Sequence, residues 1–298
     1  MKLISSSVEW WQQQNLSQHI ARVGRVCYKS KGKQPDENMS AEEAETFIQK
    51  RDEERCKGFW ESGHRSMYRH GTRYFFMPNE KGFPNYVWAY LNASPCIDYA
   101  TKDHKVWISA NLQVLLENGD MFESLKQYSV TEEEFIEKAL KYKCESAFAI
   151  LRMTFAVTTQ ISTSRELNRK SPNSIAEQST RYCNLEKKGG VQIARPHWYL
   201  YGTRLQCMVY SFVCRVCEWG YNRLLKLGLK PEDARGVLPL DTYTVAVYTY
   251  TIAEWKEIID LRYHGKTGKP HPNAHFVAER IRNIILRRMR EYLPDFDI

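Results

Sequence analysis

The chain has 298 residues, of which 43% are hydrophobic and 13% aromatic, and its formal net charge is +8. This composition excludes a disordered chain, and the length provides for one large domain or two small ones with a buried core. Mean hydropathy is −0.56, and neither a bilayer-length apolar run nor a secretory signal is visible, so we expect a cytoplasmic protein without a membrane partner. The basic charge favours anionic partners such as nucleotides. Because Lys and Arg form no uninterrupted block, nucleic acid is not expected as a partner.

The first half of the chain predicts helices, a strand and an irregular segment, in that order. A helix is expected over 8–28, and a second over 41–62, capped by Ser40 and stopped by Gly63. Residues 71–77 are rich in β-formers and predict a strand. Prolines in 78–105 indicate a loop. The chain is interpreted as a single domain, 1–298, with an insertion at 78–146.

The remaining elements alternate between short strands and long helices. The patterns predict a strand at 106–109, helices at 110–117 and 131–140, a buried strand at 147–157, helical residues at 160–170, a loop at 171–196, and helices at 203–227, 239–261 and 272–292. β-branched residues at 244–252 argue against a helix in that stretch. The pattern is α+β, with long helices packed on a small sheet.

Eight cysteines occur, and Cys214 and Cys217 form a CxxC pair. Such a pair is a metal or redox signal, but no second CxxC or His pair follows at a zinc-finger spacing. The surrounding residues read as an apolar helix. We therefore expect reduced core thiols and no metal site, and the role of the pair stays open.

The most informative stretch is residues 164–184, which combines cations with hydroxyls. Its basic residues are Arg165, Arg169, Lys170 and Arg181, and its loop serines and Thr180 add hydroxyl and backbone N–H groups. Phosphate binding uses both kinds of group. Glu177 and Gln178 are able to pair with the edge of a uracil-like base. Composition alone leaves a surface loop as the alternative to a phosphate site.

Residues 177–182 (EQSTRY) and Ser174 resemble the signature of flavin-dependent thymidylate synthases, and Cys183-Asn184 continues it as in the long-form branch. Four further blocks resemble the same family in the correct order: 63–72, 108–115, 234–239, and Asp260-Leu261-Arg262 with His271-Pro272. The resemblance thus spans nearly the whole chain. It implies the family's fold, with long helices on a small, mainly antiparallel sheet.

The resemblance also implies an activity and its cofactors. Family members methylate C5 of dUMP to give dTMP with FAD, NADPH and 5,10-methylenetetrahydrofolate, and they build their sites across a homotetramer. Arg262 would be catalytic, stabilising negative charge on the pyrimidine. Residues implied to bind dUMP are Glu166, Arg169, Glu177, Gln178, Ser179, Thr180, Arg181, Arg235 and Arg262. Residues implied to contact FAD are His64, Ser66, Arg169, Lys170, Ser171, Glu177, Thr251 and Glu257.

One catalytic motif departs from the family pattern. The Arg-His-Arg triplet, which lies against the flavin in the family, aligns with Arg169-Lys170-Ser171, so its His is Lys and its second Arg is Ser. The flexible ammonium of Lys170 is not equivalent to the planar imidazole of a His. The change of the second Arg to Ser removes a guanidinium and its paired N–H donors. Two alternatives therefore stay open: another flavin-dependent C5 modification, such as hydroxymethylation, or a catalytically silent nucleotide-binding homologue.

Overall fold

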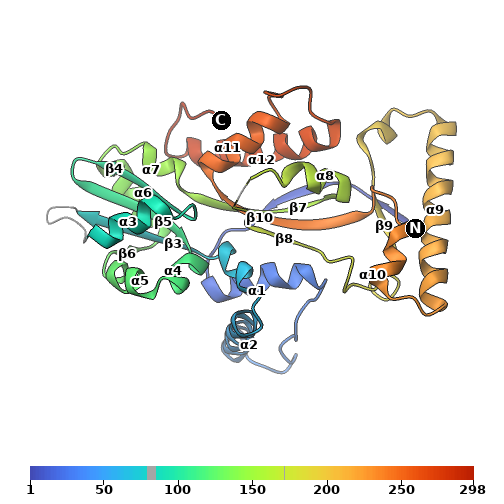
Figure 1. The fold of residues 1–298 in the computed structure, drawn as a ribbon, viewed down its shortest axis with the longest axis horizontal. Coiled ribbons are helices and arrows are strands. Elements are labelled where there is room, and N and C mark those ends of the chain that lie inside the picture. The colour runs from blue at the N-terminus through green and yellow to red at the C-terminus, as the bar shows by residue number, and fades with distance from the viewer. Residues whose placement is uncertain (79–84, 171) are drawn as a thin grey trace.

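The computed structural model describes residues 1–78, 85–170 and 172–298, and it shows an α+β protein built around two antiparallel sheets (Figure 1). The expected fold class is confirmed. Each of these two sheets has four strands, and a third, two-stranded sheet joins β1 (Lys2–Ile4) in parallel to β9 (Gln192–Ala194).

The central sheet carries the strands that position the candidate site. Its order is β2-β7-β10-β8, and all its pairings are antiparallel. The strands are β2 (Ser7–Trp10), β7 (Arg152–Gln160), β10 (Tyr243–Thr251) and β8 (Ile175–Glu177). β7 and β10 pair along their full length and are rich in β-branched and aromatic residues, which fit a buried pleated surface.

The prediction of a helix over 239–261 is wrong in its first half. Residues 243–251 form β10, and the helix α11 (Ile252–Arg262) starts only after it. The β-branched and aromatic side chains of β10 are almost all buried, so sheet packing outweighs helical continuity. Thr251 and Glu254 then form a capping box, which fixes the helix start.

The N-terminal prediction is corrected in the same way. Residues 7–10 form β2, and α1 (Leu16–Cys27) begins later with Asn15 as its cap. α2 (Ala41–Glu61) agrees with the prediction, with a Ser40 capping box, and Gly63 follows it at φ +80°. α1 and α2 pack so closely that a Cβ on Gly24 would lie 2.2 Å from the ring of Phe59.

Helices cover both faces of the central sheet (Figure 1). On one face lie α8 (Ile161–Leu167), α11 and α12 (Pro272–Arg290), and their core includes Phe155, Tyr248 and Trp255. On the other face lie α1, α2 and the 3-10 helix η1 (Arg65–His70). The two faces of the sheet therefore offer separate environments to the strand residues between them.

The second sheet has the order β4-β5-β3-β6 and its own hydrophobic cluster. Its elements are β3 (Thr72–Pro78), α3 (Asn85–Ala93), β4 (Ile97–Lys102), β5 (Lys105–Asn111), α4 (Leu112–Glu117), α5 (Gly119–Lys126), β6 (Ser129–Val130), α6 (Glu132–Lys141) and α7 (Ser146–Ala149).

Several predictions for this region are confirmed and two are corrected. The strand at 71–77 and the helices at 110–117 and 131–140 are confirmed. The loop predicted at 78–105 is wrong where it is described, since α3 and β4 occupy it; residues 79–84 lie outside the described residues. The strand predicted to start at 147 starts at Arg152, after α7. The insertion at 78–146 stays a prediction.

The remaining elements form one end of the molecule (Figure 1). They are η2 (His197–Leu200), α9 (Arg204–Lys226), α10 (Pro231–Ala234) and η3 (Arg235–Val237). The cysteines of this apolar helix were expected to be core thiols, yet only Cys214 and Tyr221 of the residues of α9 are buried. A stripe of large apolar side chains stays exposed instead: Leu205, Met208, Val209, Phe212, Val213, Val216 and Trp219. None of the described helices is both long and apolar enough to cross a membrane.

Candidate functional site

The signature loop, residues 178–182, follows β8 and folds back toward the end of α1. The Gln178 N–H donates to the Val245 carbonyl at 2.9 Å, and the Ser179 N–H donates to the Cys27 carbonyl at 2.9 Å. The Ser179 hydroxyl accepts from the N–H groups of Arg181 and Tyr182, which closes a tight turn. The N–H groups of Gln178 and Ser179 are thus used within the chain, so these two N–H groups do not donate to a ligand.

The first cluster of candidate side chains gathers around Glu232. Arg181 Nε donates to Glu232 Oε2 at 3.0 Å, and Arg235 Nε donates to the Glu232 carbonyl at 3.1 Å. Arg235 Nη1 also donates to the hydroxyl of Thr180 at 2.8 Å. The hydrogen bond from Arg181 lowers the pKa of Glu232. Three of the predicted nucleotide-binding residues therefore meet on the surface around Glu232, and of these only Arg181 contacts its carboxylate.

A second cluster lies on the opposite side of the sheet, between α8 and α11. Arg262 Nε donates to the Glu166 carbonyl at 2.8 Å, and its Nη1 lies 3.5 Å from Glu166 Oε2. Only 16% of the Arg262 side chain is exposed. Lys170 Nζ donates to both carboxylate oxygens of Glu257, at 3.0 and 2.9 Å. Four residues predicted from the sequence are thus in contact here, in two ion pairs.

Glu177 lies between the signature loop and the second cluster. Its Oε1 accepts from the Ser164 hydroxyl at 2.8 Å and from the Thr244 hydroxyl at 2.9 Å. These two bonds fix the carboxylate on the face of the sheet that α8 covers. Within the residues that the structure describes, no direct contact joins Arg262 to Arg181 or Arg235. A single chain does not bring the three arginines together.

The other predicted flavin residues are more scattered. His64 and Ser66 are exposed beside η1, and His64 Nδ1 lies 3.3 Å from the Tyr28 hydroxyl. Arg169 is exposed at the end of α8. Thr251 is only 1% exposed, and its hydroxyl is held in the capping box of α11, a structural role. Ser171 lies outside the described residues.

A buried polar line behind η1 was missed by sequence reasoning. His19 Nε2 lies 3.2 Å from the Thr154 hydroxyl, which lies 2.8 Å from the Thr249 hydroxyl, which in turn lies 2.8 Å from His70 Nδ1. Burial lowers the pKa of His19 to about 4 and that of His70 well below its ordinary value. Both imidazoles are therefore neutral near pH 7.

Two arginines that were not assigned a role hold this region together. Arg152 is 8% exposed and donates through Nη2 to the carbonyls of Arg69 and Thr249. Arg69 donates through Nη1 to the Asn173 carbonyl at 2.8 Å, which ties η1 to the signature segment. A single Arg inside the apolar run at 147–157 was the available signal for Arg152, since such a charge is kept in a core only when it is hydrogen-bonded.

No group of three or more His, Cys, Asp and Glu residues within the described chain is arranged to hold a metal ion. Cys214 is buried and Cys217 is half-buried, and both are free thiols.

Comparisons with known proteins address the family. No curated protein sequence matches the chain significantly. Two solved structures of the UMP/dUMP methylase PolB from Streptomyces cacaoi are similar. The one bound with 5-Br dUMP has a TM-score of 0.44 and 17% identity over 98% of this chain and 93% of that chain. The one bound with 5-Br UMP has a TM-score of 0.41 and 24% identity over 53% of this chain and 76% of that chain.

The sequence profile of the thymidylate synthase complementing protein family matches residues 96–291, which is about two thirds of the chain. This range contains the signature loop, both ion-pair clusters and the helix that carries Arg262. The chain therefore belongs to this family, the flavin-dependent thymidylate synthases whose motifs its sequence carries.

Proposed function

We propose that this protein methylates dUMP at C5 to give dTMP, with methylenetetrahydrofolate as the carbon donor, NADPH as the reductant and FAD as the flavin, in the cytoplasm. Family membership supports this proposal. The observation that carries it is the folding of the signature loop, which brings Arg181 to Glu232 and Thr180 to Arg235, 55 residues further along the chain from Thr180. A hydroxyl and two guanidinium groups gathered around Glu232 are suited to a phosphate.

In the proposed complex, Arg181 and Arg235 hold the phosphate of dUMP. The Glu232 carboxylate contacts Arg181 in the free chain, where its oxygens stand in for phosphate oxygens. Because this cluster is exposed, the arriving dianion can displace one carboxylate at low energetic cost. Glu166, Glu177 and the side chains of Gln178 and Ser179 then orient the nucleoside.

Arg262 supplies the electrostatic contribution to catalysis. Negative charge develops on the pyrimidine when C5 is alkylated and reduced. A guanidinium that is already fixed by Glu166 stabilises that charge without having to reorganise. The half-buried position of Arg262 strengthens the effect, because water screens it less.

The donors that fit a flavin lie at the end of α8 and beside η1, on opposite faces of the central sheet. Arg169 is exposed and makes no side-chain hydrogen bond among the described residues, and His64 and Ser66 are exposed on η1, which Arg69 ties to the signature segment. Arg169, His64 and Ser66 would hold FAD, with Lys170, Ser171, Glu177, Thr251 and Glu257 as the further family positions. A bound flavin would supply the hydride for the base. The chain's own contribution is to hold the nucleotide in place and to exclude water.

We propose a homotetramer with shared sites, which two observations support. Seven large apolar side chains of α9 are exposed along one helix, and exposed apolar patches often mark interfaces. The cluster around Glu232 and the cluster around Arg262 do not meet within one chain, so a second copy would have to complete each site.

Absorbance spectroscopy of the purified protein, with and without dUMP, tests the proposal. We expect a flavin spectrum that changes on addition of dUMP, and a product with the mass of dTMP from dUMP, NADPH and methylenetetrahydrofolate. A product heavier by one oxygen would show hydroxymethylation instead. A colourless protein that still binds dUMP would show a silent nucleotide-binding homologue.

A further inference from the structure

A basic hollow lies on the face of the central sheet that α1 covers. Its volume is about 500 Å3, and it is an open depression bordered by α1, the residues that follow α1, β10 and the loop containing Lys188. Its cationic lining consists of Arg22, Arg25, Lys29, Lys31 and Lys188. No carboxylate is found among the described residues that line it. Five positive charges therefore face one small volume.

Most of these charges have no carboxylate partner. Arg25 is paired with Asp52 at 2.7 Å. The Lys188 ammonium donates to the carbonyls of Tyr28 and Lys29, which carry no net charge. In the described parts of the chain, neither Arg22, Lys29, Lys31 nor Lys188 lies within ion-pair distance of an acidic group. Burial lowers the pKa of Lys29 and that of Arg22; Glu9, outside the hollow, partly offsets this at Arg22, while the neighbouring Lys188 and Arg25 add repulsion between cations.

Aromatic rings hold two of these cations in position. The Arg22 guanidinium lies 3.7 Å from the centre of the Trp11 ring, and Lys29 Nζ lies 5.5 Å from the centre of the Tyr243 ring. Both rings line the hollow. Cations held over aromatic faces keep their charge available for a ligand.

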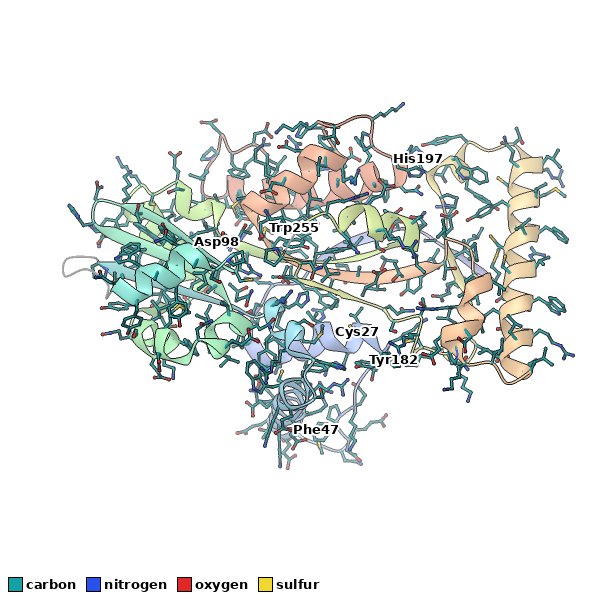
Figure 2. The ribbon with its side chains drawn as sticks, viewed as in Figure 1. Cys27, Phe47, Asp98, Tyr182, His197 and Trp255 are labelled. Atoms are coloured by element: carbon teal, nitrogen blue, oxygen red, sulfur yellow. The ribbon has the colours of Figure 1, made fainter. Side chains whose placement is uncertain are left out.

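The hollow is separate from the clusters described above. Glu177 and Thr244 face α8, where they share a hydrogen bond. The residues next to them, Gln178, Tyr243 and Val245, line the hollow on the other face. Successive residues of a strand point to opposite faces, so the hollow and the Glu177 carboxylate lie back to back across β8 and β10. Figure 2 shows the end of α1, marked by Cys27, near the signature loop, marked by Tyr182.

We propose that this hollow is a binding site for an oligoanion, a molecule with two or more closely spaced negative charges such as a diphosphate or an oligocarboxylate. The charges of the ligand lie among Arg22, Lys29, Lys31 and Lys188, and its flat or apolar part contacts Trp11 and Tyr243. The proposal depends only on the hollow and stands whether or not the protein methylates dUMP.

Isothermal titration calorimetry of the full chain tests the site, with inorganic pyrophosphate and triglutamate as probes. We expect at least one of them to bind, and the stronger of the two shows whether phosphate or carboxylate is preferred. Lys29→Gln and Arg22→Met should each weaken binding by about tenfold, as expected for the loss of one charge-assisted contact. Lys31→Gln provides a variant that cannot disturb the core, because Lys31 is fully on the surface.

Arg280→Met is the matched control, since Arg280 is an exposed helical arginine 3.6 Å from the ring of Phe276 and outside the hollow. Binding that is weakened in the three hollow variants, intact in Arg280→Met and undiminished by saturating dUMP supports the site. Three results would overturn it: no binding of either probe at low salt, an equal loss in Arg280→Met, or complete displacement by dUMP. The affinity for dUMP, measured in the same samples, reports on the proposed function separately.

Discussion

The two ion-pair clusters of this protein differ in how closely they keep the family pattern. Around Glu232, every family residue is present: Arg181 donates to the Glu232 carboxylate, while Arg235 donates to the Glu232 carbonyl and to the Thr180 hydroxyl. Between α8 and α11, the family triplet is altered, and the substituted Lys170 is bound by both oxygens of Glu257. The residues around Glu232 can thus exchange a carboxylate for a phosphate. Between α8 and α11, in contrast, the ammonium of Lys170 already neutralises the carboxylate of Glu257 in the same chain.

The largest expected effect concerns Arg262, the proposed catalytic residue on the altered side. Arg262→Ala should lower kcat by roughly 10²–10³-fold, the loss seen when one preorganised donor to a developing anion is removed. The variant should stay folded, because it loses only one hydrogen bond to the Glu166 carbonyl and one ion pair with the Glu166 carboxylate. Steady-state kinetics and thermal unfolding measure the two effects. Arg280→Ala is the control, and unchanged turnover in Arg262→Ala would remove Arg262 from the mechanism.

The next effect concerns the buried, hydrogen-bonded side chains that run from His19 through two threonines to His70. They connect α1 and η1 to the central sheet. The folded-state pKa of His19 is about 4, below its ordinary 6.5, so unfolding takes up a proton between these values. Stability should therefore be full above about pH 6.5 and fall as the pH drops toward 4, by on the order of 3 kcal/mol from this group. His70 acts in the same direction.

Urea unfolding at several pH values measures this slope. His19→Gln should flatten it, while His104→Asn, at an exposed histidine, should not. A slope that stays the same in His19→Gln would mean that the acid sensitivity arises elsewhere, in His70 or in the site clusters, and not from His19.

A smaller effect is expected on restoring the family triplet. Lys170→His combined with Ser171→Arg should tighten FAD by about tenfold, since the variant regains a planar ring and a guanidinium fork. It also frees Glu257, whose exposed side chain tolerates the loss of its partner. Flavin fluorescence measures the affinity. Lys256→His, in the neighbouring exposed pair with Asp260, is the control; no gain in affinity would mean that the triplet is misaligned.

The smallest effect is expected at Glu232. Glu232→Gln removes the carboxylate that competes with phosphate for Arg181, so dUMP should bind a few-fold more tightly, in keeping with the small energy of an exposed ion pair. Calorimetry with dUMP measures this, with Glu61→Gln in the exposed Lys57 pair as the control. Weaker binding in Glu232→Gln would indicate that the carboxylate contacts the nucleotide itself. The carboxylate around which the first cluster forms would then be part of the site and not a competitor of the phosphate.

The sequence was sufficient for the elements with strong local signals. Ser40 and Thr131 both form the capping boxes that their spacing indicates, and Gly228 ends α9 at φ +96°. It was not sufficient where packing decides between states: β10 is held by strands on both sides, and only those partners make it a strand. The contacts of Arg181 with Glu232 and of Lys170 with Glu257 span 51 and 87 residues, and no local pattern encodes them. The sequence also did not predict the exposure of α9. The hydrophobic pattern of an apolar helix is the same whether the helix packs within its own chain or against another chain.

The alternation at β8 has a consequence for how this protein can vary. Glu177 and Gln178 are adjacent in sequence, yet one side chain is bonded to Ser164 and Thr244 while the other lines the hollow on the far face. Substitutions at these neighbours should therefore combine additively, as if they were at distant positions. A deletion of one residue in β8 would instead exchange the two faces at once. Substitutions are therefore tolerable at this point of the chain, but insertions and deletions are not.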